Sequence, residues 1–421
     1  MSSQAGNGWE RLRIAGAAAL AVVLWSGAAA AQSTPKPPSW SDVCAADDDD
    51  DDAAKPAPLW KRFAFEGACV ELSGSIGATY QKQKAKAGIV SALTTRKGSV
   101  SGASEVKTTT MDFQIDTRRK TGIGDLETSF AVKYEKTSSD PGNGSATLTE
   151  GSLKWAGVRA GYTDSQMNFW DGDFQFSASA PQRTIGLAGY EFTLNDEWSL
   201  TLAYETGLPT TQASSVKFVT VYPDDPAASA RLAYEADDVS FQLAGLVHQL
   251  RIDGTHPLLT FLGRAAEHRE LGWAVTAGLT APGKLGAKGS EFSVQATRAV
   301  NASPYLGTAA DLSSLASTIP VPVSTEGWSV VGSYHLVWSE QWESNVMASY
   351  LALDIALPRA HPSVRTRRYA ANLIWKPVED FKFGAEFGYV ESEIETGGPF
   401  GLIKGISGRA LAGYLYVSRD F

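Results

Sequence analysis

The chain has 421 residues, 43% of them apolar, a formal net charge of −9 and a mean hydropathy of −0.15. Beyond the N-terminal region no stretch approaches the roughly 18 unbroken apolar residues of a membrane helix, and no ATP-binding motif, metal-ligand cluster or basic nucleic-acid patch is present. The 40 glycines and 12 tryptophans instead favour a membrane β-barrel. Its polar lumen-facing residues hide the apolar lipid-facing ones from an averaged hydropathy.

Residues 1–31 predict a secretory signal peptide. Arg11 and Arg13 precede the apolar stretch Ile14–Trp25, and Ala29–Ala31 provides a small-residue cleavage site. We expect cleavage after Ala31. The alternative, an uncleaved membrane anchor, is disfavoured because the apolar run is short for a span. An exported chain without membrane helices is periplasmic, secreted or an outer-membrane barrel.

Residues 32–66 predict an extension rich in proline and alanine. The six adjacent carboxylates Asp47–Asp52 repel one another, which predicts a solvated linker, with binding of divalent cations or basic polymers as the alternative. Cys44 and Cys69 are the two cysteines. In an oxidising periplasm we expect them to pair, closing a loop of roughly 25 residues worth about 3 kcal/mol. We expect the barrel to occupy residues 67–421.

From Cys69 onward the apolar residues recur at every second position, which is typical of strands with one apolar face. Trp198, Leu200, Leu202 and Tyr204 alternate with polar residues, and aromatic residues lie near the ends of many such segments, as at membrane interfaces. We predict about sixteen strands. They are expected at 69–80, 108–118, 124–136, 146–155, 157–163, 183–193, 197–206, 229–236, 239–250, 270–280, 290–300, 326–338, 341–353, 366–376, 380–392 and 409–421.

The links between these strands alternate in length. Short links such as 195–196 and 339–340 follow even-numbered strands, and long links such as 81–107 and 301–325 follow odd-numbered ones. Outer-membrane barrels have short periplasmic turns and long extracellular loops. An all-β, antiparallel transmembrane barrel of about sixteen strands is therefore expected, with a size that leaves an aqueous channel.

The last strand ends on Phe421. A terminal phenylalanine resembles the signal by which the barrel-assembly machinery recognises outer-membrane proteins. An aromatic side chain also suits the membrane interface, where the last strand must pair with the first.

Three stretches carry a family resemblance. Residues 69–77, 155–171 and 372–386, together with Gly124-Asp125-Leu126, resemble the alphaproteobacterial branch of the trimeric general porins. The resemblance implies passive diffusion of small hydrophilic solutes and ions through a homotrimer in the Gram-negative outer membrane, without a cofactor. Outer-membrane lipid and lipopolysaccharide are the expected surroundings.

The resemblance also implies a third extracellular loop, about 164–182, that folds into the barrel and narrows it. Its acidic side would be Asp164, Asp171 and Asp173. Opposing basic residues would set up a transverse field across the narrow section. The candidates for this basic wall are Arg118, Lys133, Arg159, Arg183, Arg368 and Lys382. Each of these charges could equally be an ordinary solvated lumen or rim charge.

Three other functions stay open. A substrate-specific channel for sugars, anions or small acids is the strongest, and a track of lumen aromatics would favour it. A structural barrel with a plugged lumen is a second. A barrel enzyme is the weakest, because none of the five histidines lies in a recognisable nucleophile motif. A charge of about −6 on the barrel mildly favours cations over anions.

Overall fold

The computed structural model describes residues 62–65, 68–91, 97–139, 142, 144–206, 220–222, 226–236, 238–253, 268–307, 324–356, 361–395 and 403–421. The expected signal peptide, the Asp47–Asp52 run and Cys44 lie outside these residues, so the predicted disulfide with Cys69 stays a prediction. Among the described residues, no helix has the length and apolar character needed to cross a bilayer.

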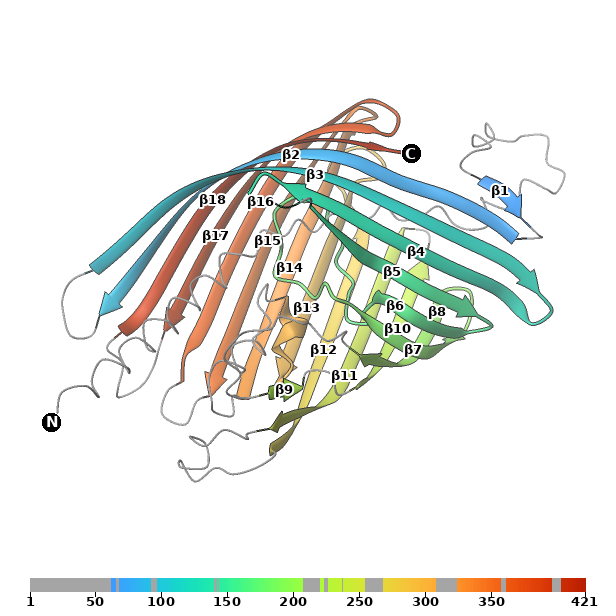
Figure 1. Ribbon diagram of the computed structural model, residues 1–421, viewed down its shortest axis with the longest axis horizontal. Coiled ribbons are helices and arrows are strands. Elements are labelled where there is room, and N and C mark those ends of the chain that lie inside the picture. The colour runs from blue at the N-terminus through green and yellow to red at the C-terminus, as the bar shows by residue number, and fades with distance from the viewer. Residues whose placement is uncertain are drawn as a thin grey trace.

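The described chain is almost entirely strand (Figure 1). Two short strands, β1 (Arg62–Phe65) and β9 (Thr220–Tyr222), pair with β2 and β11. The other sixteen are β2 (Ala68–Ser91), β3 (Lys97–Thr121), β4 (Gly124–Thr137), β5 (Ser145–Trp155), β6 (Val158–Asp164), β7 (Thr184–Thr193), β8 (Trp198–Thr206), β10 (Ala227–Ala236), β11 (Val239–Asp253), β12 (His268–Pro282), β13 (Glu291–Val300), β14 (Ser324–Ser339), β15 (Trp342–Ala356), β16 (Ser363–Val378), β17 (Phe381–Glu395) and β18 (Ile403–Asp420).

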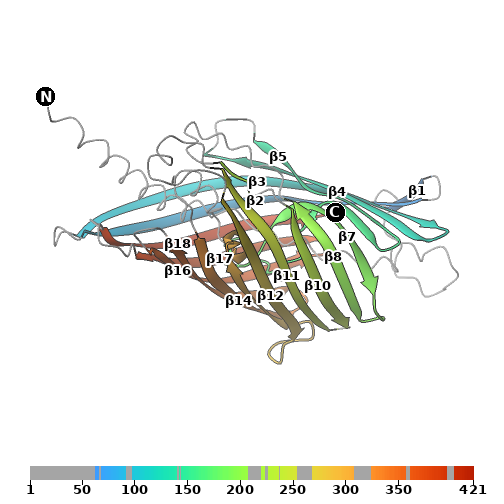
Figure 2. The same ribbon diagram turned by 90° about the horizontal axis from the view of Figure 1, so that it is seen from below.

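These sixteen strands form a closed antiparallel barrel. Each pairs with its neighbour in the chain, β8 with β10 included, and β18 pairs with β2 to complete the ring. In Figure 2, β2 and β3 run along one side of the barrel and β10–β12 along the other. Closure extends to the last residue, because Phe421 exchanges two backbone hydrogen bonds with Gly74 of β2, at 2.9 and 3.1 Å. Closure leaves no long free sheet edge in the bilayer.

The predicted sixteen-strand barrel is therefore confirmed, with one difference at its first hairpin. The expected long loop 81–107 is wrong, because β2 continues to Ser91 and β3 begins at Lys97. This stretch is rich in lysine, glycine and serine and lacks apolar alternation. It is a strand because β2 has ladder partners on both sides, β18 and β3, along nearly its whole length.

The short turns show how local sequence ends the strands. Ala156 and Gly157 join β5 to β6 with φ angles of +48° and +87°. Positive φ at both central residues defines the hairpin turn whose twist matches that of the flanking strands, and glycine suits the second position. In the next short turn, the Asn195 side chain accepts hydrogen bonds from the backbone N–H groups of Glu197 and Trp198, at 3.0 and 2.7 Å.

Large apolar side chains cover the outer face of the barrel. Leu415, Phe387, Tyr369 and Val346 on adjacent strands are all about half exposed or more. A row of this kind is stable in lipid and not in water. Polar and small residues occupy the inner phase of the same strands. The observed alternation thus places these large apolar side chains on the outward, lipid-facing side of the barrel.

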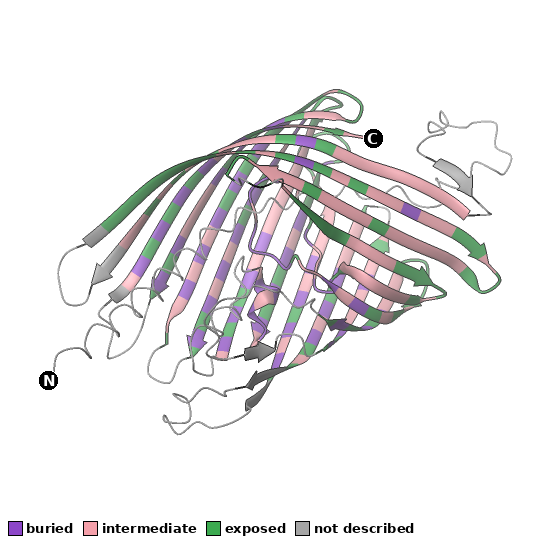
Figure 3. Ribbon diagram, viewed as in Figure 1, coloured by how far each residue is buried: buried purple, intermediate pink, exposed green. Residues whose placement is uncertain are grey.

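Burial divides the inner wall into two halves (Figure 3). Inner-phase residues of β11–β18 are repeatedly buried, as in the pattern of β15, whereas those of β2–β6 are mostly intermediate. The segment 165–183 between β6 and β7, drawn largely in purple, accounts for much of the difference. Apart from a hydrogen bond from Thr79 Oγ1 of β2 to Gln175, at 3.3 Å, its described hydrogen bonds to the wall go to the first half and to Glu205 of β8. The short helix η2 (Ser303–Leu306) also contributes Tyr305 and Leu306 to the buried apolar cluster on the inner wall.

Candidate functional site

The segment 165–183 is tied to the barrel where it leaves β6. The buried carboxylate of Glu205, on β8, accepts hydrogen bonds from Ser165 Oγ at 2.7 Å and from the backbone N–H of Gln166 at 2.9 Å. The Asn168 side chain closes the base of the segment: its Nδ2 donates to the carbonyl of Arg183, and its Oδ1 accepts from the Arg183 N–H, both at 3.0 Å. The base is therefore a fixed structure.

Two glutamines of the inner wall hold the next stretch. Gln242 Nε2, on β11, donates to the carbonyls of Gln166 and Asn168 at 2.9 and 3.1 Å. Gln295, on β13, donates from Nε2 to the carbonyl of Met167 and accepts from the N–H of Trp170, at 2.8 and 2.9 Å. A side-chain amide both donates and accepts, so it can replace the missing strand partner of this irregular backbone.

The tip, residues 173–176, reaches β16 and β17. Asn372 Nδ2 donates to the carbonyl of Asp173 at 2.6 Å. The carboxylate of Glu386 accepts from the N–H groups of Gln175 and Phe176, at 2.8 and 2.6 Å. A segment that bonds to the inner phase of β8, β11, β13, β16 and β17 lies against the concave side of the closed sheet.

Small residues on the wall make room for the aromatic side chains of the segment. A Cβ added to Gly388 would meet the Phe176 ring at 2.6 Å, and one added to Gly278 would clash with the Phe169 ring. Trp170, Phe174 and Phe176 form a buried cluster with wall residues. The wall members are Val331, Met347, Ala370, Ala412 and Tyr414. Wall and segment are thus matched in shape.

The three predicted acidic residues lie on or next to this segment. Asp164 is the last residue of β6, and Asp171 and Asp173 lie in the stretch that leads to the tip. Desolvation by the surrounding protein, together with the nearby carboxylates of Asp173, Asp164 and Glu291, raises the pKa of Asp171 to about 6. Close charges of one sign disfavour the ionised form. The three predicted residues thus lie near one another and near Glu291 on β13, which was not predicted.

The six predicted basic residues fall into two groups. Three contact the segment or belong to it: Lys382 Nζ lies 3.3 Å from Asp173 Oδ2, Arg368 Nη1 donates to Ser177 Oγ at 2.7 Å, and the Arg183 guanidinium lies 5.0 Å from the Tyr305 ring centre.

The other three basic residues pair with acids on their own part of the wall. Arg118 pairs with Asp125 and Glu127, Lys133 with Glu135 at 3.9 Å, and Arg159 with Glu191 at 3.0 Å. None of these pairs bonds to residues 165–183 among the described contacts. These residues lie on β3–β7, outside the strands β11–β18 whose inner residues the segment helps to bury.

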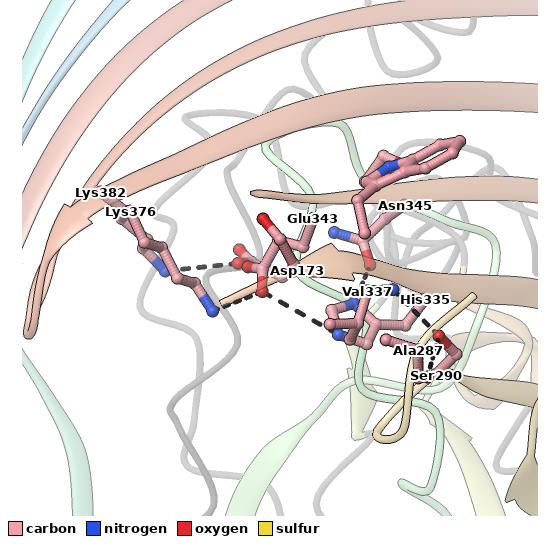
Figure 4. Close-up of polar contacts among 12 residues, drawn as sticks. Asp173, Ala287, Ser290, His335, Val337, Glu343, Asn345, Lys376 and Lys382 are labelled. Carbon is pink, nitrogen blue, oxygen red and sulfur yellow. Dashed lines mark hydrogen bonds and ion pairs between the residues drawn. The ribbon is translucent and has the colours of Figure 1, made fainter. Parts of the chain in front are cut away.

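A second charged group, next to Asp173, was not predicted (Figure 4). Glu343 on β15 forms an ion pair with Lys376 and lies 4.0 Å from His335 Nε2, while His335 Nδ1 contacts Asn345 Oδ1 at 2.7 Å. In Figure 4, Lys376 and Lys382 reach toward Glu343 and Asp173 from one side and His335 from the other. The inner-phase position of Glu343 and His335 in the alternation was the available signal.

The buried anchors Glu205, Glu386, Gln242, Gln295 and Asn372 were also missed. Alternation places them in the lumen phase, but nothing in one sequence distinguishes a polar residue that faces water from one that bonds a folded-in segment. Among the described residues, no group of three or more His, Cys, Asp or Glu side chains has a metal-binding arrangement.

Comparison with known proteins agrees with this architecture. Residues 66–401 match the family model described as the porin subfamily. No curated protein sequence matches the chain. The match covers well over half of the chain, so the chain belongs to the porin subfamily.

One solved structure shares the fold, and a second is more distantly similar. The outer membrane channel DcaP of Acinetobacter baumannii is 18% identical, with a TM-score of 0.55 over 85% of this chain and 99% of that one. OmpF of Salmonella typhi, in complex with daunomycin, is 10% identical, with a TM-score of 0.47 over 86% of this chain and 100% of that one. Family and fold together define an outer-membrane β-barrel porin, a channel through which small solutes diffuse.

Proposed function

We propose that the protein is a general diffusion porin with a weak preference for cations, and that segment 165–183 forms its narrowest section. The observation that carries this proposal is the position of the segment against one half of the inner wall, with Asp164, Asp171, Asp173 and Glu291 gathered beside it. Lys382 is the one basic side chain that pairs with this cluster among the described ion pairs. The local charge is therefore negative.

A transverse field supports the same proposal. Arg159 on β6 and Lys154 on β5 both contact Glu191, and Arg231 on β10 lies near this group. Counted around the ring of sixteen, β15, which carries Glu343, is eight strands from β6. Basic residues on one side and acidic residues on the other order water and favour polar solutes over apolar ones.

The alternative of a substrate-specific channel receives less support. A sugar or aromatic-solute track needs aromatic side chains that face the channel. In the described part of the chain, Trp170, Phe174, Phe176 and Tyr414 are buried where the segment meets the wall, Tyr416 is also buried, and most other aromatic side chains face outward. Catalysis is the weaker alternative still: His335 contacts Asn345 and Glu343, an arrangement that contains no nucleophile.

The finer assignments are part of the same proposal. The alphaproteobacterial branch and the homotrimer rest on the stretches 69–77, 155–171 and 372–386. The signal peptide 1–31, the extension 32–66 and the Cys44–Cys69 disulfide rest on the sequence arguments above. Recognition by the barrel-assembly machinery is supported by the pairing of Phe421 with Gly74.

Lipopolysaccharide is the proposed lipid partner. At the long-loop end, Arg367, Glu391, Arg409 and Lys86 form one row across β16, β17, β18 and β2 on the outer face. Arg409 and Arg367 lie 3.2 and 3.8 Å from Glu391, while Lys86 is exposed. Cations next to exposed apolar side chains suit a lipid with phosphate groups.

Planar-bilayer recording under a salt gradient tests the proposed function. We expect conductance steps in groups of three with a weak cation preference, and a heat-modifiable oligomer on gels. A silent bilayer would instead support a plugged barrel, and block by one solute class a specific channel. A single band before and after boiling would contradict the trimer.

A further inference from the structure

The tip of segment 165–183 depends on one buried carboxylate. We propose that Glu386 is the residue that positions this tip against the wall, and that loss of its charge in acid releases the tip into the channel. The inference rests on the proposed function, because it takes the segment to be the narrowest section. It concerns what fixes the width of that section, rather than what the section selects.

The geometry assigns each oxygen of Glu386 a separate task. Oε1 accepts the N–H of Phe176 at 2.6 Å, and Oε2 accepts the N–H of Gln175 at 2.8 Å. Asn372, opposite Glu386 in the β16–β17 ladder, holds the carbonyl of Asp173 at 2.6 Å. Two side chains thus fix three of four consecutive tip residues, and Glu386 is only 5% exposed.

A charged carboxylate is required for this arrangement. Its two oxygens are both acceptors, whereas a carboxylic acid has one oxygen that carries a proton and acts as a donor. Protonation would therefore place a hydroxyl oxygen, a weaker acceptor than a carboxylate oxygen, opposite one of the two N–H groups. Both hydrogen bonds would lose the contribution of the negative charge, and one buried N–H would be poorly paired, which destabilises the position of the tip.

The ionisable groups around Glu386 do not neutralise it directly. Asp173 approaches from the segment, Tyr414 and Tyr416 from β18, and Arg368 from β16, with Glu343 on β15 beyond Tyr416. Arg368 is engaged with Ser177, and Lys382, on β17 itself, with Asp173. Among the described ion pairs Glu386 has none, so hydrogen bonds hold its charge.

The anchor continues into the wall as a directional chain. Asn372 Oδ1 accepts from both the N–H and the Nδ2 of Asn345, at 2.8 and 3.0 Å. Asn345 Oδ1 is thereby free to accept from His335 Nδ1, at 2.7 Å. The orientation of both amides is fixed by these contacts. Asn372 thus has its amide already directed at the tip. Of the two residues that hold the tip, Asn372 and Glu386, only Glu386 has a charge that acid can remove.

Release of the tip has one available direction. The wall lies behind it, so a tip without its acceptors moves into the lumen and carries Asp171 and Asp173 with it. The base of the segment stays attached through Glu205, Gln242 and Gln295. We therefore expect lower conductance rather than a wider pore.

Single-channel conductance of the purified full chain, measured from pH 8 to pH 5, tests this inference. Wild type should lose conductance as the pH falls. Glu386→Gln, which has one acceptor oxygen, should have the low conductance already at pH 8 and lose the pH-dependent shift. Glu127→Gln is the matched control, because Glu127 is an inner-wall carboxylate that pairs with Arg118 and does not contact the segment. It should retain the wild-type shift.

A tether provides a second test that does not depend on folding of the glutamine variant. The N–H of Ser179 donates to Ser349 Oγ at 3.0 Å, so Ser179→Cys with Ser349→Cys can bond the segment to β15. Oxidation should abolish the acid response and reduction should restore it. A folded Glu386→Gln channel with wild-type conductance and a full pH shift would overturn the inference. A shift in selectivity in Asp171 and Asp173 variants would leave the proposed function standing.

Discussion

Side chains of segment 165–183 divide into those that attach it and those that face the channel. Ser165, Asn168 and the backbone groups of the tip make the attachments, whereas Asp171 is exposed and takes part in none of the hydrogen bonds described above. Asp173 attaches the segment twice, since its carbonyl is held by Asn372 and its carboxylate pairs with Lys382. The charge of Asp171 can therefore be changed without loosening the segment.

The first prediction concerns these carboxylates. Asp171→Asn combined with Asp173→Asn should reduce the cation preference, because two of the four clustered negative charges are removed. Reversal potentials under a salt gradient provide the measurement. Asp125→Asn, which alters an acid paired with Arg118 away from the segment, is the control. Unchanged reversal potentials in the double variant would mean that both carboxylates lie off the ion pathway.

The raised pKa of Asp171 leads to a second prediction. An acid with a pKa of about 6 is mostly charged at pH 7.5 and mostly neutral at pH 5. The cation preference of the wild type should therefore decrease as the pH falls through 6. The corresponding part of the change should be missing in Asp171→Asn. A reversal potential that stays constant between pH 7.5 and 5 would contradict the assignment.

Residue roles could be predicted only where a pattern distinguishes them. The family resemblance indicated Asp171 and Asp173 on the loop, and Lys133 and Lys382 were two of the candidates for the basic wall. Neither prediction could show that Lys382 meets the segment while Lys133 pairs with Glu135. That difference depends on the path of residues 165–183 to β17, where Lys382 lies 209 residues from Asp173 in the chain.

Among the elements, the segment and its seat on the wall form one packed unit. Gly388 lies under the Phe176 ring, with only 2.6 Å available to an added Cβ. Burial of an aromatic side chain is worth about 1.5–3 kcal/mol, so the absence of a wall side chain here stabilises the folded-in position. The wall contributes by shape as well as by hydrogen bonding.

Enlarging this glycine is the third prediction. Gly388→Val should push the tip away from the wall and lower single-channel conductance at neutral pH. Gly413→Val is the matched control, because a Cβ at Gly413 on β18 meets nothing within 4 Å. Liposome swelling with neutral sugars of increasing size gives an independent measurement. Equal swelling rates for both variants would show that the seat does not determine the pore size.

The turn between β5 and β6 allows a fourth prediction. Ala156 has φ = +48°, a conformation that alanine rarely adopts and asparagine tolerates. Ala156→Asn should therefore stabilise the barrel by about 0.5–1 kcal/mol. Urea-dependent unfolding in lipid vesicles, followed by tryptophan fluorescence, measures the change. Gly157→Asn, at φ = +87° beside the Tyr190 ring, is a comparison expected to destabilise. A destabilised Ala156→Asn variant would be the contrary result.

Strand positions were the most predictable elements, since lipid on one side and water on the other impose a period of two. The exception, 81–107, is informative. Lys82, Lys84 and Lys86 are all exposed on one face of β2. The period of two is therefore present in the positions of the charged residues, although the apolar residues do not show it. A hydropathy pattern finds strands in the membrane and misses their continuation beyond it.

At the scale of the whole molecule, closure between β2 and β18 determines whether a channel exists. The two hydrogen bonds between Gly74 and Phe421 are the terminal pair of this seam, and the Phe421 ring lies against Gly74. A barrel that fails to close exposes unpaired backbone groups to lipid, each costing several kcal/mol.

The fifth prediction follows from this seam. Deletion of Phe421 should lower the fraction of protein that reaches a folded, heat-modifiable barrel in the outer membrane. Phe421→Tyr, which keeps both the backbone pair and the aromatic ring, should assemble normally. Semi-native gel electrophoresis of membrane fractions quantifies both variants. Normal assembly of the deletion variant would show that neither the pair nor the ring is needed.

The separation of attachment from solute contact in segment 165–183 has an evolutionary consequence. The residues that seat it, such as Gln295, Gly388 and Glu386, are constrained by burial and by each other. Asp171 and the exposed Glu291 carry no such constraint. The charge at either position can be removed or reversed by a single substitution, and the barrel stays folded at each step. Selectivity in this channel is therefore expected to drift quickly between related bacteria, while pore architecture changes slowly.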